Sequence, residues 1–105
     1  MSEPYTYELM PSANLDLDGI MEYIAIQLCA KDSAIALLNE IEEAIEQACS
    51  FPEAASPVND PTLRHRGYRK LIVKNYIVFY IPDEANRKLN VMRIVYFAQD
   101  YMKEL

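Results

Sequence analysis

The sequence predicts an α+β fold in which an N-terminal strand and an αα-hairpin precede a three-stranded antiparallel meander and a short C-terminal helix. Apolar residues recur at helical spacing in the first half of the chain, whereas β-branched and aromatic segments separated by short polar turns dominate the second half. At 105 residues the chain is expected to form one domain, residues 1–105. Because helices and sheets each bury one apolar side, we expect the helices to cover one face of the sheet.

The first strand and the first helix are predicted from a change of period. Polar and apolar residues alternate from Pro4 to Met10, which is typical of a half-buried strand. Pro11 ends this alternation, and the Ser12 hydroxyl is expected to cap the helix that follows. The predicted apolar stripe of this helix is Leu17, Ile20, Met21, Ile24 and Leu28.

A second helix follows, with Asp32 or Ser33 as its expected N-cap and Phe51-Pro52 as its end. Glutamates between residues 40 and 46 lie mainly off its apolar stripe. They have no candidate base or metal ligand beside them, so we interpret them as a solvated helix surface rather than a site for acid–base chemistry. The predicted buried face of this helix is Ile35, Leu38, Ile41, Ile45 and Ala48.

The two cysteines, Cys29 and Cys49, fit a reducing compartment. In an antiparallel hairpin that turns near Lys31 they are separated by roughly 24 Å, at about 1.5 Å per helical residue, which is too far for a disulfide. Both are expected to act as small apolar core residues.

The second half of the chain predicts a loop followed by a meander. Pro57 and Pro61 mark the loop, and the pair Lys74-Asn75 fits a tight hairpin turn between two strands. A polar turn then precedes a last strand rich in β-branched and aromatic residues. The predicted segments are a loop over Glu53–Leu63, strands over Tyr68–Val73, Tyr76–Ile81 and Leu89–Phe97, and one or two helical turns over Gln99–Leu105.

The net charge of −6 conceals two halves of opposite sign. Residues 1–60 carry twelve acids and one base, a net charge of −11, and residues 61–105 carry nine bases and four acids, a net charge of +5. Between Arg64 and Lys74 there are five bases and His65 but no acid. This basic segment is either an ordinary solvated surface or a surface for an anionic partner. No membrane span or signal-peptide pattern is present, so we expect a cytoplasmic protein that requires neither cofactor nor metal.

A series of local sequences, in this order, runs from about residue 5 to the C-terminus. They are Tyr7, Leu15-Asp16-Leu17-Asp18-Gly19-Ile20 with Tyr23-Ile24, Phe51-Pro52, Arg69, Tyr76-Ile77-Val78-Phe79-Tyr80-Ile81-Pro82-Asp83-Glu84, Val91-Met92-Arg93-Ile94-Val95-Tyr96, and Gln99-Asp100-Tyr101. The combination resembles the RelE/ParE superfamily of toxins from type II toxin–antitoxin systems, including the plasmid-stabilisation type. The resemblance implies a growth-inhibiting toxin that a cognate antitoxin neutralises. It also implies one of two targets, because RelE-like members cut mRNA on the ribosome and ParE-like members bind DNA gyrase.

Two positions depart from the pattern of the RelE-like endonucleases. Cleavage by the RNA 2′-hydroxyl needs a base, an acid and cations that stabilise the phosphate. Tyr76 and Ala98 stand where the resemblance implies cations, and His65 lies before the meander rather than in the tail. We therefore favour a ParE-like inhibitor of DNA gyrase. The alternatives are a ribosome-dependent mRNA endonuclease and a degenerate, non-toxic member that only binds the antitoxin.

The candidate site residues lie in the basic half of the chain. Arg93 is expected either to pair with an acid such as Asp100 or to point into the site, and the tyrosines either pack on the sheet or stack on a ligand. An amphipathic antitoxin segment is expected to place acids near Arg66, Arg69 and Arg93. The candidates for binding the target or the antitoxin are Arg64, Arg66, Arg69, Lys70, Lys74, Tyr76 and Arg93. If the protein is an enzyme, its catalytic candidates are Arg69, Arg93, Tyr96 and Tyr101.

Overall fold

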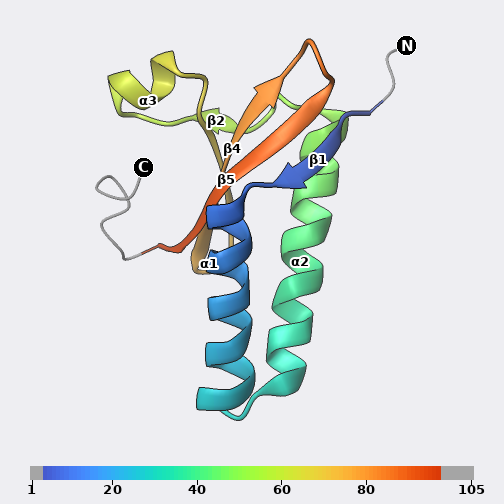
Figure 1. Cartoon of the computed structure of the whole chain (residues 1–105), viewed down its shortest axis with the longest axis vertical. Helices are drawn as coiled ribbons and strands as arrows, with labels where there is room; N and C mark the ends of the chain where they lie inside the picture. Colours follow the sequence, from blue (N-terminus) through green and yellow to red (C-terminus); the bar gives the residue numbers. More distant parts are fainter. Residues whose placement is uncertain (1–3, 98–105) are drawn as a thin grey trace.

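The computed structural model describes residues 4–97 and confirms the predicted α+β class (Figure 1). A helical hairpin stands against a five-stranded sheet with the strand order β1-β5-β4-β3-β2. The predicted terminal helix over residues 99–105, and Tyr101 with it, lies outside the described residues. The elements are β1 (Thr6–Leu9), α1 (Pro11–Glu22), the π-helical segment η1 (Tyr23–Gln27), α2 (Lys31–Ser50), β2 (Ser56–Pro57), α3 (Pro61–His65), β3 (Arg69–Val73), β4 (Tyr76–Asp83) and β5 (Lys88–Tyr96).

The predicted meander is present as β3, β4 and β5, which pair antiparallel in sequence order. Val73 pairs with Tyr76 across the predicted two-residue turn, in which Lys74 adopts a φ of 53°. The sheet is wider than the meander, because β1 pairs parallel to β5 along one side and β2 pairs antiparallel to β3 along the other. Strand β5 therefore has neighbours on both sides over its first half.

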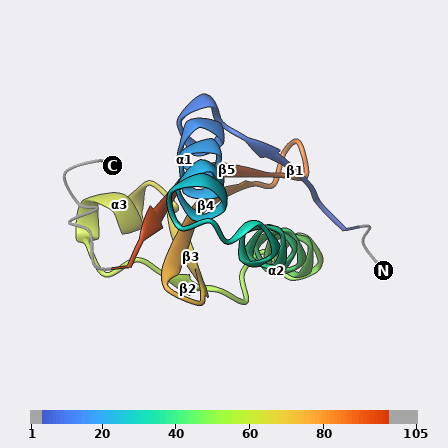
Figure 2. The same ribbon diagram turned by 90° about the horizontal axis from the view of Figure 1, so that it is seen from below.

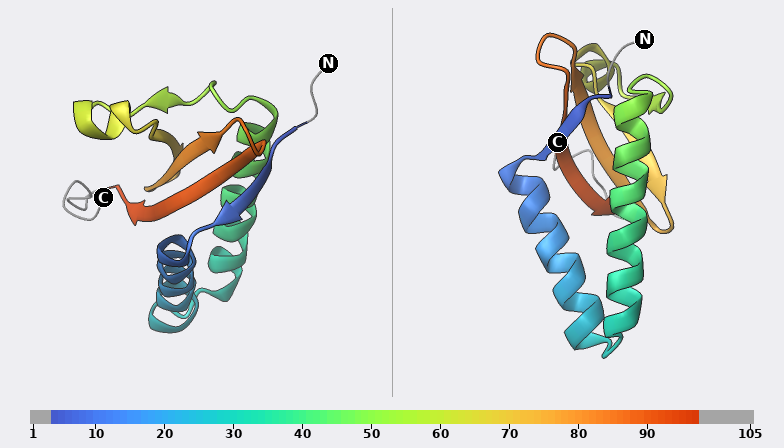
Figure 3. Two further views of the ribbon diagram at one scale, coloured as in Figure 1. Left: turned by 45° about the horizontal axis from the view of Figure 1, so that its top comes forward. Right: turned by 90° about the vertical axis from the view of Figure 1, so that its right-hand side faces the viewer.

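The predicted helical hairpin is confirmed, but both predicted N-caps are wrong. Helix α1 begins at Pro11, whose fixed φ suits a first helical position, so Ser12 already lies inside the helix. Helix α2 begins at Lys31 after Ala30, and no side chain caps it. The two helices lie side by side, and their tip extends beyond the sheet (Figure 3).

The apolar stripe predicted for the first helix is wrong at its C-terminal end, at Leu28. Helix α1 continues into the π-helical turn η1, which changes the angular spacing of side chains, and Leu28 is 55% exposed. Cys29 has a φ of 51° and is exposed, so its predicted core position is wrong, whereas Cys49 is buried as predicted. Both thiols are free.

The buried face of α2 lies about one residue away from the predicted one at its N-terminal end. Ile35 is 48% exposed, because the buried side chains of α2 repeat from Ala34 rather than from Ile35. Ile41, Ile45 and Ala48 are buried as predicted. The buried residues of α2 are Ala34, Leu37, Ile41, Ile45, Ala48 and Cys49.

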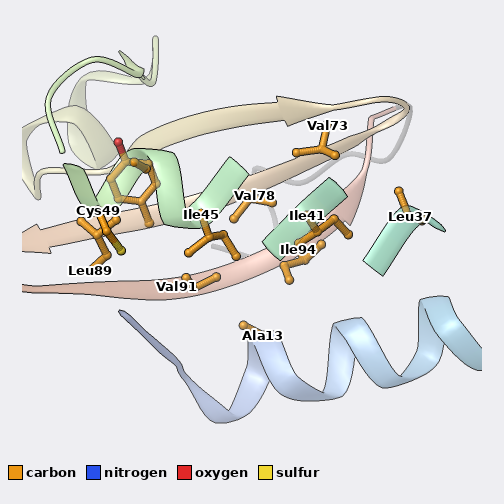
Figure 4. Close-up of a cluster of buried hydrophobic side chains, with 12 residues drawn as sticks. Ala13, Leu37, Ile41, Ile45, Cys49, Val73, Val78, Leu89, Val91 and Ile94 are labelled. Carbon is orange, nitrogen blue, oxygen red and sulfur yellow. The ribbon is translucent and has the colours of Figure 1, made fainter. Parts of the chain in front are cut away.

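Buried side chains form two clusters, one on each face of the sheet. Along β4, Val78 and Tyr80 join the cluster under the helical hairpin (Figure 4), whereas Ile77 and Phe79 point to the other face. The hairpin covers one face, as predicted. Segment 53–63, predicted as a loop, contains β2 and most of α3, and α3 covers the other face opposite α2 (Figure 2). The second cluster comprises Val58, Leu63, Tyr68, Ile77, Phe79 and Val95.

Within residues 4–97, none of the helices combines the length and the hydropathy needed to cross a bilayer.

Candidate functional site

A groove of about 790 Å³ separates α1 from the second half of β5 and the start of β4. In Figure 1 this is the region where the lower end of β5 passes behind α1. The groove brings together three of the predicted site residues, Tyr76, Arg93 and Tyr96. Its lining residues are Leu15, Asp16, Gly19, Ile20, Tyr23, Tyr76, Arg93, Ile94, Val95 and Tyr96.

The guanidinium of Arg93 forms a two-pronged ion pair with the Asp16 carboxylate on the groove wall. Its Nε donates to Oδ2 of Asp16 at 2.7 Å, and its Nη2 donates to Oδ1 at 2.9 Å. The two side chains are only 21% and 16% exposed, so water screens the attraction less than at an open surface. Of the two predicted possibilities for Arg93, pairing with an acid is the one observed, although the acid is Asp16 and the suggested Asp100 lies outside the described residues.

The backbone of β5 explains why Asp16 lies at this point. Phe79 pairs with Arg93 and Tyr80 pairs with Val91, so Met92 is the extra residue of a bulge. Strand β1 accompanies β5 only as far as Val91. Beyond that point the Ile94 N–H donates to Oδ2 of Asp16 at 2.9 Å. One carboxylate therefore neutralises Arg93 and also replaces the missing strand partner of Ile94.

Tyrosines supply the hydroxyl groups of the groove. The rings of Tyr76 and Tyr96 meet edge to face with centroids 5.6 Å apart. Burial, and then the neighbouring Tyr96 and Tyr23, raise the pKa of Tyr76 above its usual value. The Tyr76 hydroxyl is therefore neutral at physiological pH, where it acts as a hydrogen-bonding group and not as a strong base.

Apolar side chains form an exposed rim around the groove. Leu15 is 73% exposed, Tyr23 is 54% exposed and Tyr96 is 47% exposed. Phe97, next along the chain, is 55% exposed. Single exposed apolar residues are ordinary, but several beside one groove are typical of a surface that contacts another protein.

Arg69 lies outside the groove lining and anchors a loop. Its Nη1 donates to the carbonyl oxygens of Glu53 at 3.1 Å and Ala55 at 2.6 Å. Its cross-strand neighbour Tyr80 donates its hydroxyl to the carbonyl of Pro52 at 2.7 Å. Burial raises the pKa of Tyr80 to about 12, although the charge of Arg69 acts in the opposite direction. The two side chains thus hold the chain that follows α2 against the sheet.

The other predicted site residues lie in two further places. Lys74, in the β3–β4 turn, pairs with Glu40 of α2 at 3.3 Å. Arg64 and Arg66 are exposed at the end of α3, and half-buried Lys70 follows on β3. The guanidinium of Arg66 lies 5.3 Å from the ring centroid of Tyr68. The predicted set is therefore spread over the groove, the loop anchor, a hairpin turn and α3.

Asp16, Gly19 and Tyr23 were missed by sequence reasoning. Nothing in the sequence near Asp16 indicates that its partner lies 77 residues away. The available signal is that Asp16, Gly19 and Tyr23 lie three or four residues apart and so share one side of a helix. In the described part of the chain, no group of three His, Cys, Asp or Glu side chains could hold a metal ion.

Residues 7–101 match the family model described as the ParE toxin of the type II toxin–antitoxin system parDE. The chain belongs to this family. No curated protein matches the sequence. The ParE-family chain is also similar to a chain from the solved chromosomal ParDE system of P. aeruginosa, with a TM-score of 0.70 and 18% identity over 90% of this chain and 98% of that one.

A second solved structure, the RelBE2 toxin–antitoxin complex of Mycobacterium tuberculosis, contains a chain with a TM-score of 0.64 to the ParE-family chain. The identity is 18%, over 90% of this chain and 99% of that one. At such identities both likenesses establish the fold. The family itself follows from the match of residues 7–101 to the ParE model.

Proposed function

We propose that this ParE-family toxin stops growth by binding DNA gyrase rather than by cutting RNA, and that a cognate antitoxin neutralises it. One observation carries the preference for binding over cleavage. The cation that lines the groove, Arg93, already forms a two-pronged ion pair with Asp16. A guanidinium held in this way is a poor stabiliser of a developing phosphate charge, because the aspartate competes for it.

The remaining groups of the groove do not supply general acid–base chemistry near neutral pH. The titratable side chains beside the ion pair are Tyr23, Tyr76 and Tyr96. Burial makes Tyr76 a weaker acid, and therefore leaves less of its basic form at pH 7. His65 lies at the end of α3 and is not part of the groove lining. A ribonuclease mechanism would have to recruit its base from elsewhere.

The same groove suits a segment of a protein. It combines an apolar rim, tyrosine hydroxyls and a charged pair in one concave surface. Aromatic and arginine side chains are enriched among the residues that carry binding energy at protein interfaces. Binding requires none of the aligned acids and bases that catalysis requires.

Blocking the groove tests this proposal. Apart from its chain neighbours and the backbone of its own helix, no heavy atom lies within 4 Å of the position where a Cβ at Gly19 would stand, so Gly19→Leu is expected to fill the groove without disturbing the fold. Purified Gly19→Leu protein should need at least about tenfold more protein to inhibit gyrase supercoiling, a change of about 1.4 kcal/mol in binding. The matched control is Ser12→Leu, at an exposed position of the same helix outside the groove lining, and it should inhibit normally.

A second assay separates the two targets. Ribosomes carrying an mRNA are incubated with the unmodified chain, and early cleavage products are mapped. Intact mRNA together with inhibited supercoiling is the expected result. Rapid cleavage at defined codons without an effect on gyrase would overturn the proposal.

The internal partners of Arg69 and Arg93 change where we expect the acids of the antitoxin to bind. Arg69 and Arg93 already have partners inside the toxin, so acids of the antitoxin are no longer expected to pair with these two side chains. Apolar contacts would then carry much of the affinity. Co-purification of toxin and antitoxin should survive about 0.3 M salt, at which exposed charges are largely screened, and complete dissociation there would contradict this picture.

The alternative, an mRNA endonuclease, is favoured by one observation. Arg64 and Arg66 are exposed beside His65 on α3, and cations of this kind hold RNA phosphates. If cleavage occurs, substitutions on α3 should reduce it more than Gly19→Leu does. The ribosome assay described above applied to these variants distinguishes the two arrangements.

A further inference from the structure

We propose that the outer end of α3, together with the start of β3, binds the phosphate backbone of double-stranded DNA. The surface consists of Arg64, Arg66 and Lys70, with His65 beside them, and is called the α3 basic surface below. The inference rests on the proposed function, because DNA bound to gyrase would place a duplex next to a toxin seated on that enzyme. The groove and the α3 basic surface would then contact protein and DNA, respectively.

Several cations outside the α3 basic surface already have partners within the chain. Lys74, Lys88 and Arg93 each form an ion pair with a carboxylate, and Arg69 is bound to loop carbonyls. Among residues 4–97, no ion pair joins a carboxylate to any cation of the α3 basic surface. Asp60, the acid nearest to this surface in sequence, accepts a hydrogen bond from the Leu63 N–H at 3.0 Å at the opposite end of α3. These three charges are therefore available to an anion.

Buried neighbours hold the α3 basic surface in place. Leu63 and Tyr68, which flank its arginines, are 5% and 3% exposed and belong to the second core cluster. Gly67, with a φ of +89°, turns the chain back from α3 into β3, and its N–H donates to the Arg64 carbonyl at 3.0 Å. The Arg66 guanidinium lies against the Tyr68 ring. A partner that binds here does not have to order a loop first.

The sheet separates the α3 basic surface from the glutamates of α2. Helix α2, which carries Glu40, Glu42, Glu43 and Glu46, lies on the opposite side of the sheet from α3 (Figure 2). Electrostatic attraction and repulsion between exposed charges decay over about 8 to 10 Å at physiological salt. A duplex that approaches α3 is therefore exposed mainly to the local positive charge and not to the net charge of −6.

The burial of the aromatic and apolar side chains beside these cations favours a DNA duplex over other anions. Single-stranded nucleic acids bind where exposed aromatic rings stack on bases, but Tyr68, the ring beneath these cations, is buried. An acidic peptide would need apolar anchors, and Leu63 is buried as well.

Fluorescence anisotropy with a labelled 20-base-pair DNA duplex tests the proposal with the full chain and without gyrase. Three phosphate contacts predict that the logarithm of the association constant falls with the logarithm of salt concentration with a slope of about −2.7. The variant that combines Arg64→Gln, Arg66→Gln and Lys70→Gln should bind at least tenfold more weakly, with a slope near zero. Lys31→Gln removes an exposed cation at the start of α2 and is the matched control that should bind normally.

Two further probes decide the nature of the ligand. Tighter binding of a 20-nucleotide polyuridine strand than of the duplex would overturn the duplex assignment. Equal binding of polyglutamate would show a surface for acidic proteins and would also overturn it, as would a triple variant that binds the duplex as well as the parent. Because gyrase is absent, these results are independent of the supercoiling assay. Duplex binding with unimpaired supercoiling would support the inference and contradict the proposed function.

Discussion

The sheet face under α1 and α2 and the sheet face under α3 differ in size, in charge and in how they use arginine. The hairpin face buries a large cluster that includes Ile41, Leu89 and Ile94, and its arginines are drawn into internal contacts. The α3 face buries a smaller cluster around Leu63 and Phe79, and its arginines stay on the surface. An arginine in a basic stretch of sequence is therefore no guide to function until its partners are known.

The largest effect is expected from a cavity in the hairpin face. Ile41→Ala should lower the free energy of unfolding by about 2–5 kcal/mol, because Ile41 is 1% exposed and belongs to the cluster that includes residues of both the hairpin and the sheet. Leu63→Ala, its counterpart on the α3 face, should fall at the lower end of that range. Chemical denaturation measures both. Equal losses of unfolding free energy in these two variants would show that the two sheet faces contribute equally to stability. Ile24 is half-buried, so Ile24→Ala should lower the free energy of unfolding less than Ile41→Ala does.

The second-largest effect on stability is expected from breaking the ion pair between Asp16 and Arg93. Asp16→Asn should lower the free energy of unfolding by about 1–3 kcal/mol, since Arg93 loses its counter-ion at a partly buried position. Glu8→Gln removes the exposed partner of Lys88 and should change stability by less than about 1 kcal/mol. Thermal unfolding of the two variants provides the comparison. If Asp16→Asn is as mild as Glu8→Gln, the pair is no part of the structural framework.

Tyr80→Phe tests the hydrogen bond from Tyr80 to Pro52 through the pH dependence of stability. The variant should lose about 0.5–1.5 kcal/mol near pH 7, because the Pro52 carbonyl loses its donor. The pKa of Tyr80 is raised from 10.0 to about 12 in the folded chain, so the folded state holds this proton more tightly than the unfolded state does. Its contribution is complete below pH 10 and is lost as the pH rises towards 12. Unfolding measured between pH 9 and about pH 12 should show a weaker alkaline slope in the variant. Parallel slopes would contradict the raised pKa.

The smallest effect has the opposite sign. Gly19→Ala should raise the free energy of unfolding by about 0.5–1 kcal/mol, because alanine favours a helix interior and has open space at this position. A methyl group occupies little of a groove of about 790 Å³, so inhibition of the target should be retained. Destabilisation would show that the groove wall is closer to Gly19 than described.

Local patterns were enough to predict the hairpin, the meander and its two-residue turn, because period and turn chemistry are written in neighbouring residues. They were insufficient for the parallel pairing of β1 with β5, which joins Thr6 to Lys88. The same limit applies to the site. Tyr76 and Tyr96 lie opposite each other in the β4–β5 pairing, whereas the partner of Arg93 comes from α1.

Segment 53–63 shows a different kind of failure. Its prolines were interpreted as marks of an irregular loop, yet Pro61 opens α3 and Asp60 caps it. A proline at a first helical position and a proline in a loop give the same local signal. The predictions of Ser12 as one N-cap and of Asp32 or Ser33 as the other were wrong because α1 and α2 both begin before these residues.

The pairing of β1 with β5 has a consequence for how the chain acquires its structure. Strand β5 lies between the first strand and β4, and it supplies Leu89, Val91 and Ile94 to the main core. A ribosome that has not yet reached Lys88 has therefore produced the helices without the strand that binds them to the sheet. Contacts between residues so far apart in sequence are slow to form, because a long loop must close first. We expect the nascent chain to stay without a stable tertiary structure until β5 has emerged, so that the groove is assembled only after Tyr96 has been synthesised.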